Sequence, residues 1–147
     1  QIQGYVHDPG AAMYGGVAGH AGLFGTAQDL AVVFQLLLNK GSYGDVHLLK
    51  PETIAAFTKR QSKLSRRGWG WDKPEPEKGK GGSAGKLAPK STFGHTGFTG
   101  TCVWADPENE LTYIFLSNRV YPSATNNTLL DLGIRTKIHD LIYEAMK

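Results

Sequence analysis

Apolar residues recur every three or four positions between residues 26 and 38, which is the clearest periodic pattern in the chain. The run Thr26-Ala27-Gln28-Asp29 just before them resembles a capping box, in which two side chains bond each other's backbone N–H groups. Asn39-Lys40-Gly41 then supplies a stop, because glycine adopts the left-handed backbone that ends many helices. The pattern predicts a helix with this apolar stripe: Leu30, Val33, Phe34, Leu37 and Leu38.

A second, shorter helix is predicted after a turn over Gly41-Ser42-Tyr43-Gly44. Pro51 suits the first helical position, since its missing N–H has no partner there in any case. The helix is expected to run to about Lys59 and to bury Ile54 and Phe57.

A third helix is predicted from about Thr128 to Met146. Thr128 and Asp131 are its candidate capping residues, because short polar side chains accept bonds from the first backbone N–H groups of a helix. The helical spacing of its apolar residues indicates one buried face. That face is made of Ile134, Ile138, Leu141, Ile142 and Ala145.

The pattern changes to a period of two after residue 92, which is typical of strands. We predict one strand near Thr99 to Ala105, a turn at Asp106-Pro107-Glu108-Asn109 and a second strand from Leu111 to Ser117, both strands well buried. Trp69-Gly70-Trp71 is expected to begin a further extended segment. The predicted fold class is therefore α/β (α+β), with two or three antiparallel strands backed by the C-terminal helix and a helical region from residue 26 to about 59.

Composition allows one modest domain with a real core, since the chain has 147 residues, of which 40% are hydrophobic. The first 25 residues hold seven glycines and read as a packed loop. Residues 73–90 hold five lysines, four glycines and three prolines, and we predict a mobile surface loop there. No aromatic residue lies between those lysines, so the net charge of +3 does not indicate nucleic-acid binding.

Other class signals are weak. The chain has a single cysteine, Cys102, so an internal disulfide is excluded. Cys102 lies in an apolar strand pattern, which predicts a buried packing thiol. We expect no transmembrane segment, because no apolar run reaches 18 residues. The chain begins at Gln1 directly in structured sequence, which reads as a piece of something longer, so the compartment is not inferred from a missing signal.

Ser83 lies in two motifs that are associated with nucleophilic serines. Gly81-Gly82-Ser83-Ala84-Gly85 matches G-x-S-x-G, yet that elbow needs a strand before the serine and a helix after it. Ser83-Ala84-Gly85-Lys86 matches S-x-x-K, which needs a helical turn to bring the amine to the hydroxyl. The surrounding glycines argue against a helix, so Ser83 is not predicted to be the nucleophile.

The sequence His95-Thr96-Gly97 stands before a predicted strand, and it resembles the K-T-G or H-T-G element of penicillin-recognising serine hydrolases. Three other segments follow the order of the class C β-lactamase-like family, so the resemblance covers almost the whole chain. They are Val17 to Ala31, Leu48-Leu49-Lys50-Pro51-Glu52-Thr53-Ile54 and Gly68-Trp69-Gly70-Trp71.

The chain resembles still more closely the β-lactamase-like domains that are fused behind bacterial family 3 glycoside hydrolases. Three segments carry this resemblance: Val6-His7-Asp8-Pro9, Gly15 to Gly22 and Ser117-Asn118-Arg119-Val120-Tyr121-Pro122. It implies a periplasmic or cell-envelope location in bacteria. It also implies a small-molecule or cell-wall-derived acyl substrate and no cofactor.

The resemblance implies a serine acyl-transfer site. The backbone N–H of Phe98 would form half of an oxyanion hole, and His95 would polarise the proton network near the serine. Thr96, Gly97 and Thr99 would line the substrate side. His20 precedes a helix N-terminus in the glycine loop, where it either lines the cleft or packs within that loop. Since His95 replaces the lysine of K-T-G and supplies less charge, an esterase, amidase or peptidase is favoured over a true β-lactamase.

The departures from the family pattern concern the nucleophile. The S-x-x-K of the family lies far upstream of H-T-G, and Y-x-N or S-x-N is absent here. We therefore expect residues 1–147 to be the C-terminal part of one β-lactamase-like domain, inactive alone, whose partner is the N-terminal remainder of the parent chain. Self-association through exposed apolar surface is a further expectation.

A different class of function stays open at this point: a non-catalytic module that binds glycan or peptidoglycan peptide for a neighbouring glycosidase. Metal binding is not predicted, because His7, His47 and His139 lack the spacing and the carboxylate neighbours of a metal site.

Overall fold

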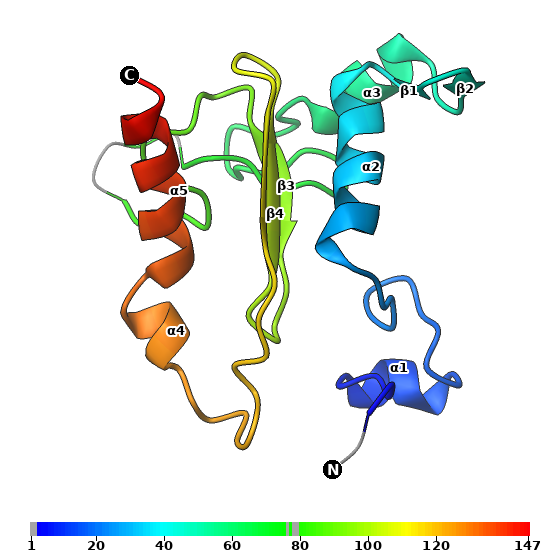
Figure 1. Cartoon of the computed structure of the whole chain (residues 1–147), viewed down its shortest axis with the longest axis vertical. Coiled ribbons are helices and arrows are strands. Elements are labelled where there is room, and N and C mark those ends of the chain that lie inside the picture. Colours follow the sequence, from blue (N-terminus) through cyan, green and yellow to red (C-terminus); the bar gives the residue numbers. More distant parts are fainter. Residues whose placement is uncertain (1–2, 76, 78–79) are drawn as a thin grey trace.

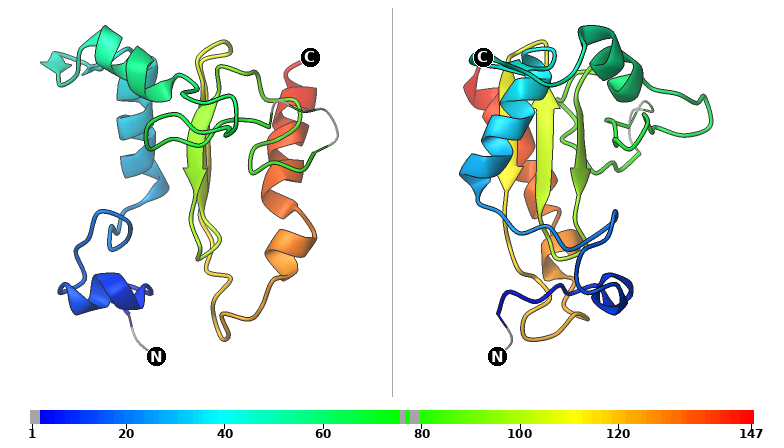
Figure 2. Two further views of the ribbon diagram at one scale, coloured as in Figure 1. Left: turned by 180° about the vertical axis from the view of Figure 1, so that it is seen from behind. Right: turned by 90° about the vertical axis from the view of Figure 1, so that its right-hand side faces the viewer.

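A three-stranded antiparallel sheet separates two groups of helices in the computed structural model of the chain, which describes residues 3–75, 77 and 80–147 (Figure 1). The strand order is β3-β4-β5, with β3 at one edge. Helix α2 covers one face of the sheet, and α4 and α5 lie on the other (Figure 2). The strands are β3 (Phe93–Thr96), β4 (Cys102–Asp106) and β5 (Leu111–Phe115), and the main helices are α2 (Ala27–Leu38), α3 (Pro51–Thr58), α4 (Thr128–Asp131) and α5 (Ile134–Ala145).

The central strand β4 sends alternate side chains into two separate cores. Cys102 and Trp104 pack with Tyr113 toward α5, whereas Val103 and Ala105 pack toward α2. This period of two is what a strand buried on both faces requires, because successive side chains point to opposite sides. The predicted fold class, with antiparallel strands backed by a C-terminal helix, is confirmed.

Helix α2 begins as the sequence predicts. Thr26 Oγ1 accepts the Asp29 N–H at 3.2 Å, and Asp29 Oδ2 accepts the Thr26 N–H at 2.8 Å, which is a complete capping box. The predicted stripe was wrong at Val33, which is 52% exposed, and it omitted the buried Leu36. Phe34, Leu37 and Leu38 of the predicted stripe do pack toward the sheet.

The segment that follows α2 in the chain forms a β-hairpin that the sequence pattern did not predict. Strands β1 (Ser42–Tyr43) and β2 (Val46–His47) pair where only a turn was predicted. Helix α3 begins at Pro51 as expected and buries Ile54. The prediction for Phe57 was wrong, because its half-exposed ring packs edge-to-face against Trp69 at 5.4 Å instead of entering the core.

The predicted C-terminal helix is two helices. Gly133 takes a left-handed backbone with φ of 60° and separates α4 from α5, so no continuous helix runs from Thr128 to Met146. Asn127 is the residue before α4, and neither Thr128 nor Asp131 is the cap that was predicted. The predicted stripe was also wrong at Leu141 and Ala145, which are exposed, while the buried residues of α5 are His139 and Tyr143.

The segment of residues 73–90 contains no helix or strand in its described part, and residues 76, 78 and 79 of the predicted loop lie outside the described residues. Its ends are anchored. Lys73 is 5% exposed and donates from Nζ to the Ser91 carbonyl at 2.8 Å; burial, together with the charge of Arg60, lowers its pKa to about 8. Ala84 is buried against Trp104. The mobility of the middle of this segment stays a prediction.

The turn that follows β3 occupies residues 97–100, so β4 begins three residues later than the predicted start at Thr99. Gly100 has φ of 108°, a backbone conformation that glycine adopts without strain. Helix α1 (Pro9–Met13) lies at the same end of the molecule as this turn (Figures 1 and 2). None of the helices found in the described residues is long and apolar enough to cross a membrane.

Candidate functional site

The predicted H-T-G element lies at the end of the edge strand β3. Asp72 pairs with this strand through an isolated bridge: the Asp72 N–H donates to the Gly94 carbonyl at 2.8 Å, and the Gly94 N–H donates to the Asp72 carbonyl at 3.1 Å. A side chain at Gly94 would collide with the Val103 carbonyl and Trp104, which explains the glycine. This bridge places Asp72 opposite Gly94, the residue that precedes His95.

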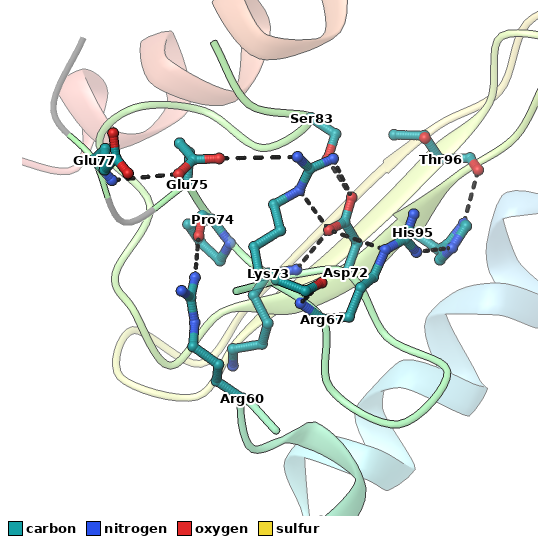
Figure 3. Close-up of polar contacts among 12 residues, drawn as sticks. Arg60, Arg67, Asp72, Lys73, Pro74, Glu75, Glu77, Ser83, His95 and Thr96 are labelled. Carbon is teal, nitrogen blue, oxygen red and sulfur yellow. Dashed lines mark hydrogen bonds and ion pairs between the residues drawn. The ribbon is translucent and has the colours of Figure 1, made fainter. Parts of the chain in front are cut away.

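The Asp72 carboxylate is the centre of a buried polar network (Figure 3). It is 2% exposed and accepts from Arg66 Nε at 2.7 Å, Arg66 Nη2 at 3.2 Å, Ser83 Oγ at 2.5 Å and the Lys73 N–H at 3.0 Å. Burial alone raises the pKa of this carboxyl. The hydrogen bonds from Arg66 and Ser83 more than offset burial, and the pKa is held below its ordinary value.

Arg67 brings a guanidinium group to His95. Its Nη1 lies 2.6 Å from His95 Nε2, and His95 Nδ1 lies 2.8 Å from the Thr96 carbonyl (Figure 3). Arginine can only donate, so Nε2 is the acceptor and Nδ1 carries the proton that is donated to Thr96. Arg67 Nε also lies 3.7 Å from Asp72, and its side chain is about half exposed. The positive charge of a guanidinium group therefore lies directly beside His95.

Ser83 is held in the network around Asp72. Its hydroxyl donates to the carboxylate and receives Arg66 Nη2 at 3.4 Å. Residues 83–86 form bends and turns without helix, and Lys86 is exposed, so the S-x-x-K geometry is absent there. Because its pKa is lowered, Asp72 is a poor base for activating this hydroxyl. These contacts give Ser83 a structural role and agree with the prediction that it is not the nucleophile.

The turn at residues 97–100 presents the Phe98 peptide at the end of β3. The Gly97 N–H donates to the Thr101 carbonyl at 2.8 Å, and the Gly100 N–H donates to the Gly97 carbonyl at 3.0 Å. Within residues 3–75, 77 and 80–147, no group accepts a hydrogen bond from the Phe98 N–H. A side chain at Gly97 would collide with the Thr101 hydroxyl. The Phe98 N–H is thus available to a ligand, as an oxyanion hole requires.

Two contacts surround the Phe98 ring, which is 66% exposed. The His7 ring stacks on it with centroids 5.5 Å apart, and the Arg119 guanidinium carbon lies 4.5 Å from its centroid. His7 belongs to the N-terminal segment, so that segment forms part of the surroundings of the turn. The Thr99 carbonyl accepts the Arg119 N–H at 2.9 Å, and Thr96 ends the strand half-buried.

His20 takes a different place from the other predicted residues. Its Nε2 lies 2.9 Å from Asp8 Oδ1, the same atom that accepts the Ala11 N–H at 2.8 Å and caps α1. The bonds from Ala11 and His20 lower the pKa of Asp8. The structure thus brings His95, Thr96, Gly97, Phe98 and Thr99 together at the end of β3, and places His20 on the cap of α1.

Three polar residues of this region were not singled out from the sequence: Arg67, Asp72 and Arg119. The charged pair Arg66-Arg67 just before the Gly68-Trp69 motif was a local signal for the first. Asp72 becomes important only through its pairing with Gly94, which spacing does not reveal. Among the described residues, no group of three or more histidine, cysteine or acidic side chains is arranged to hold a metal ion.

Comparison with known proteins gives a consistent picture. Residues 3–134 match the beta-lactamase family. Proteins of Salmonella paratyphi B and Salmonella newport, provisionally named D-alanyl-D-alanine carboxypeptidases, are each 41% identical over 156 residues, which cover 99% of this chain and 36% of each relative. The chain therefore spans about a third of the length of these relatives.

The crystal structure of a β-lactamase from Mycobacterium bovis superposes with a TM-score of 0.62 at 22% identity, covering 82% of this chain and 44% of that one. At this identity the likeness concerns the fold. It agrees with the sheet and the flanking helices described above.

Proposed function

Since the chain belongs to the β-lactamase family, we propose that it forms the oxyanion and substrate wall of a serine acyl hydrolase with carboxypeptidase-like specificity. One observation carries the proposal: the H-T-G element ends the edge strand, with the Phe98 N–H available beside it and Arg67 on its histidine. The nucleophile is proposed to lie in a part of the parent chain that precedes these residues. Residues 1–147 are then the C-terminal part of one domain.

In this proposal the reaction proceeds through an acyl-enzyme. The serine oxygen forms a bond to the substrate carbonyl carbon while a base takes the serine proton. The carbon–nitrogen bond then breaks, and the leaving amine takes a proton. Water attacks the resulting ester and restores the serine. The Phe98 N–H donates to the carbonyl oxygen as negative charge develops on it, which lowers the barrier of both halves of the reaction.

The other predicted site residues act around that donor. His95, held by Arg67 and the Thr96 carbonyl, orients the proton network at the end of the strand. Thr96, Gly97 and Thr99 line the path of the acyl group. His20 has a more distant part in the N-terminal wall, through its contact with Asp8.

Arg67 favours a substrate that ends in a carboxylate. The relatives are named for D-alanyl-D-alanine carboxypeptidase activity, and a D-alanyl-D-alanine peptide carries a negative charge at its end. The guanidinium beside His95 supplies a positive charge at this place, and arginine binds carboxylates with two parallel hydrogen bonds. Acyl-peptides are therefore proposed as the substrate class, ahead of neutral esters.

The wider context of the domain stays a prediction. A cell-envelope location agrees with a carboxypeptidase acting on cell-wall peptides. The glycoside hydrolase fusion that the sequence resemblance implies, and self-association through apolar surface, are separate expectations about the parent protein.

The proposal is tested by assaying the full-length parent and the 147 residues alone on a D-alanyl-D-alanine peptide, a p-nitrophenyl ester and nitrocefin. Turnover is expected only from the parent, and Ser83→Ala in the parent is expected to retain it. Turnover by the 147 residues that Ser83→Ala abolishes would instead make Ser83 the nucleophile.

The specificity of Arg67 is tested separately. Arg67→Gln in the parent is expected to raise KM for the peptide about tenfold, as loss of one charge-assisted contact would, and to leave KM for the uncharged ester unchanged. Lys137→Gln removes an equal charge from the exposed face of α5 and serves as the matched control. An equal rise in KM for both substrates would contradict carboxylate recognition.

A further inference from the structure

Arg119 is a buried arginine whose charge is met by backbone carbonyls. It is 9% exposed, and no salt bridge in the described part of the chain links it to a carboxylate. Its Nε donates to the Phe98 carbonyl at 2.8 Å. Its Nη1 lies within hydrogen-bond distance of the Ala124 carbonyl at 3.1 Å, the Asn126 carbonyl at 2.9 Å and Asn127 Oδ1 at 3.3 Å. Burying a charged group costs free energy, which suggests that Arg119 has a function that offsets this cost.

The contacts of Arg119 fix one side of Phe98. The side chain holds the Phe98 carbonyl and the backbone N–H holds the Thr99 carbonyl at 2.9 Å. Two consecutive peptide groups of the turn are therefore bonded to a single residue. The guanidinium also lies against the Phe98 ring, which restricts the side chain from the same direction.

The other side of Phe98 is fixed by the turn itself. The Gly97 carbonyl accepts the Gly100 N–H at 3.0 Å. Gly97 C=O and Phe98 N–H belong to the same planar trans peptide, so they point in opposite directions. The Phe98 N–H therefore points away from the inside of the turn. The hydrogen bond of the turn thus orients the peptide that carries the Phe98 N–H, and Arg119 holds the two peptides that follow it, so Arg119 secures the turn as a whole.

We propose that Arg119 is the positioning residue that secures the turn at residues 97–100 and so keeps the Phe98 N–H in the geometry of an oxyanion donor. It acts by tying the turn at residues 97–100 to the backbone of residues 124–127. The proposal rests on the proposed function, and it adds a residue that does not itself touch the substrate. A donor that is fixed before the reaction gains most from the developing charge, because no reorganisation is needed at that moment.

Lysine is not equivalent at this position. The arginine fork reaches the Phe98 carbonyl with one nitrogen and the 124–127 backbone with another, whereas an ammonium group is a single point. Arg119→Lys therefore keeps the charge and loses the bridge. Arg119→Met removes both, with a side chain of related length.

The test uses the full-length parent with Arg119→Lys, Arg119→Met and the control Arg60→Lys. Arg60 also donates to a backbone carbonyl, that of Pro74 at 3.2 Å, away from the turn. We expect kcat on an acyl substrate to fall about 100-fold in Arg119→Met, the size of effect seen when one oxyanion donor is lost. KM is expected to stay within about twofold, because the interaction is made in the transition state.

A second measurement separates this proposal from the proposed function. Backbone amide hydrogen exchange in residues 97–101 is expected to accelerate in both Arg119 variants and to stay unchanged in Arg60→Lys. A parent that turns over no acyl substrate would refute the proposed function and the oxyanion role with it, and exchange alone would then decide whether Arg119 holds the turn. Unchanged kcat, or unchanged exchange in a folded Arg119→Lys protein, would overturn the proposal. If Arg119→Met does not fold, Arg119→Lys gives both readouts.

Discussion

Two histidines of the chain, His139 and His95, have different surroundings. His139 is 1% exposed, packs among Trp104, Tyr113 and Tyr143, and accepts the Gly85 N–H on Nδ1 at 3.1 Å. His95 is exposed at the end of β3 and faces Arg67. His139 forms a hydrogen bond in the interior that ties α5 to Gly85, whereas His95 presents polar atoms at the edge of the sheet.

The comparison shows what separates a structural histidine from a candidate site residue. Burial lowers the pKa of His139 to about 4, outweighing the nearby charges of Asp140 and Asp106, so the ring is neutral where the protein is stable. Its aromatic neighbours exclude ligands. Around His95, the donors and acceptors belong to Arg67 and Thr96, and part of that cluster stays open to solvent.

The largest expected effect is a loss of stability in acid that is caused by protonation of His139. Its pKa is lower in the folded chain than in the unfolded one, so the unfolded state binds more protons between about pH 6.5 and 4. The free energy of unfolding is expected to fall by about 3 kcal/mol as pH drops through this window. Urea unfolding at pH 7, 5.5 and 4 measures the loss.

The control for this effect is His139→Gln, which keeps an acceptor and removes the titration. The variant is expected to lose less stability with acid than the parent sequence. Equal acid sensitivity in the two proteins would contradict the assignment of this effect to His139.

A smaller loss is expected from Asp72→Asn, on the His95 side. The change leaves Arg66 without its carboxylate and weakens the hold on Ser83 and Arg67. Because Arg66 is about one third exposed, water replaces part of the lost contact, and we expect about 2 kcal/mol of destabilisation. Thermal unfolding of Asp72→Asn against Glu75→Gln, a weaker partner of Arg66 at 3.9 Å, checks the assignment. A similar loss of stability in the two variants would show that Asp72 is not the main partner of Arg66 in this network.

The smallest effect on stability is expected from His95→Gln. The side chain is exposed, so the free energy of unfolding should change by less than about 0.5 kcal/mol. In the full-length parent, the same change is expected to lower kcat on an acyl substrate at least about tenfold, if the histidine takes part in proton transfer. Stability and activity measured on one preparation decide the matter. A clear loss of stability in His95→Gln would contradict this expectation and indicate a structural role for His95.

Local chemistry accounts for what could be predicted from the sequence. The capping box at Thr26, the helix start at Pro51 and the strand pairing around Asp106-Pro107-Glu108-Asn109 depend on neighbouring residues, and all three are present. The break at Gly133 was missed, because a single glycine in an apolar periodic run does not reveal a left-handed backbone.

The candidate site shows the same limit. His95-Thr96-Gly97 could be found as a contiguous motif, and its neighbours could not. Arg67 reaches His95 from 28 positions away in the chain, and Arg119 reaches Phe98 from 21 positions away. Phe57 and Leu141 were misplaced for a related reason. Spacing shows that a residue lies on one side of a helix, and the packing partner decides whether that side is covered.

The alternation along β4 limits how the turn before it can change. Trp104 and Ala105 are neighbours in the sequence and serve different cores, so inserting or deleting one residue at positions 97–101 would require the strand to slip or to bulge. A slip would direct the indole ring of Trp104 toward α2 and leave the aromatic group around His139 without its largest member. Laboratory evolution of this turn should therefore proceed by exchanging residues at constant length, and libraries that vary the length in single steps should yield mostly unfolded chains.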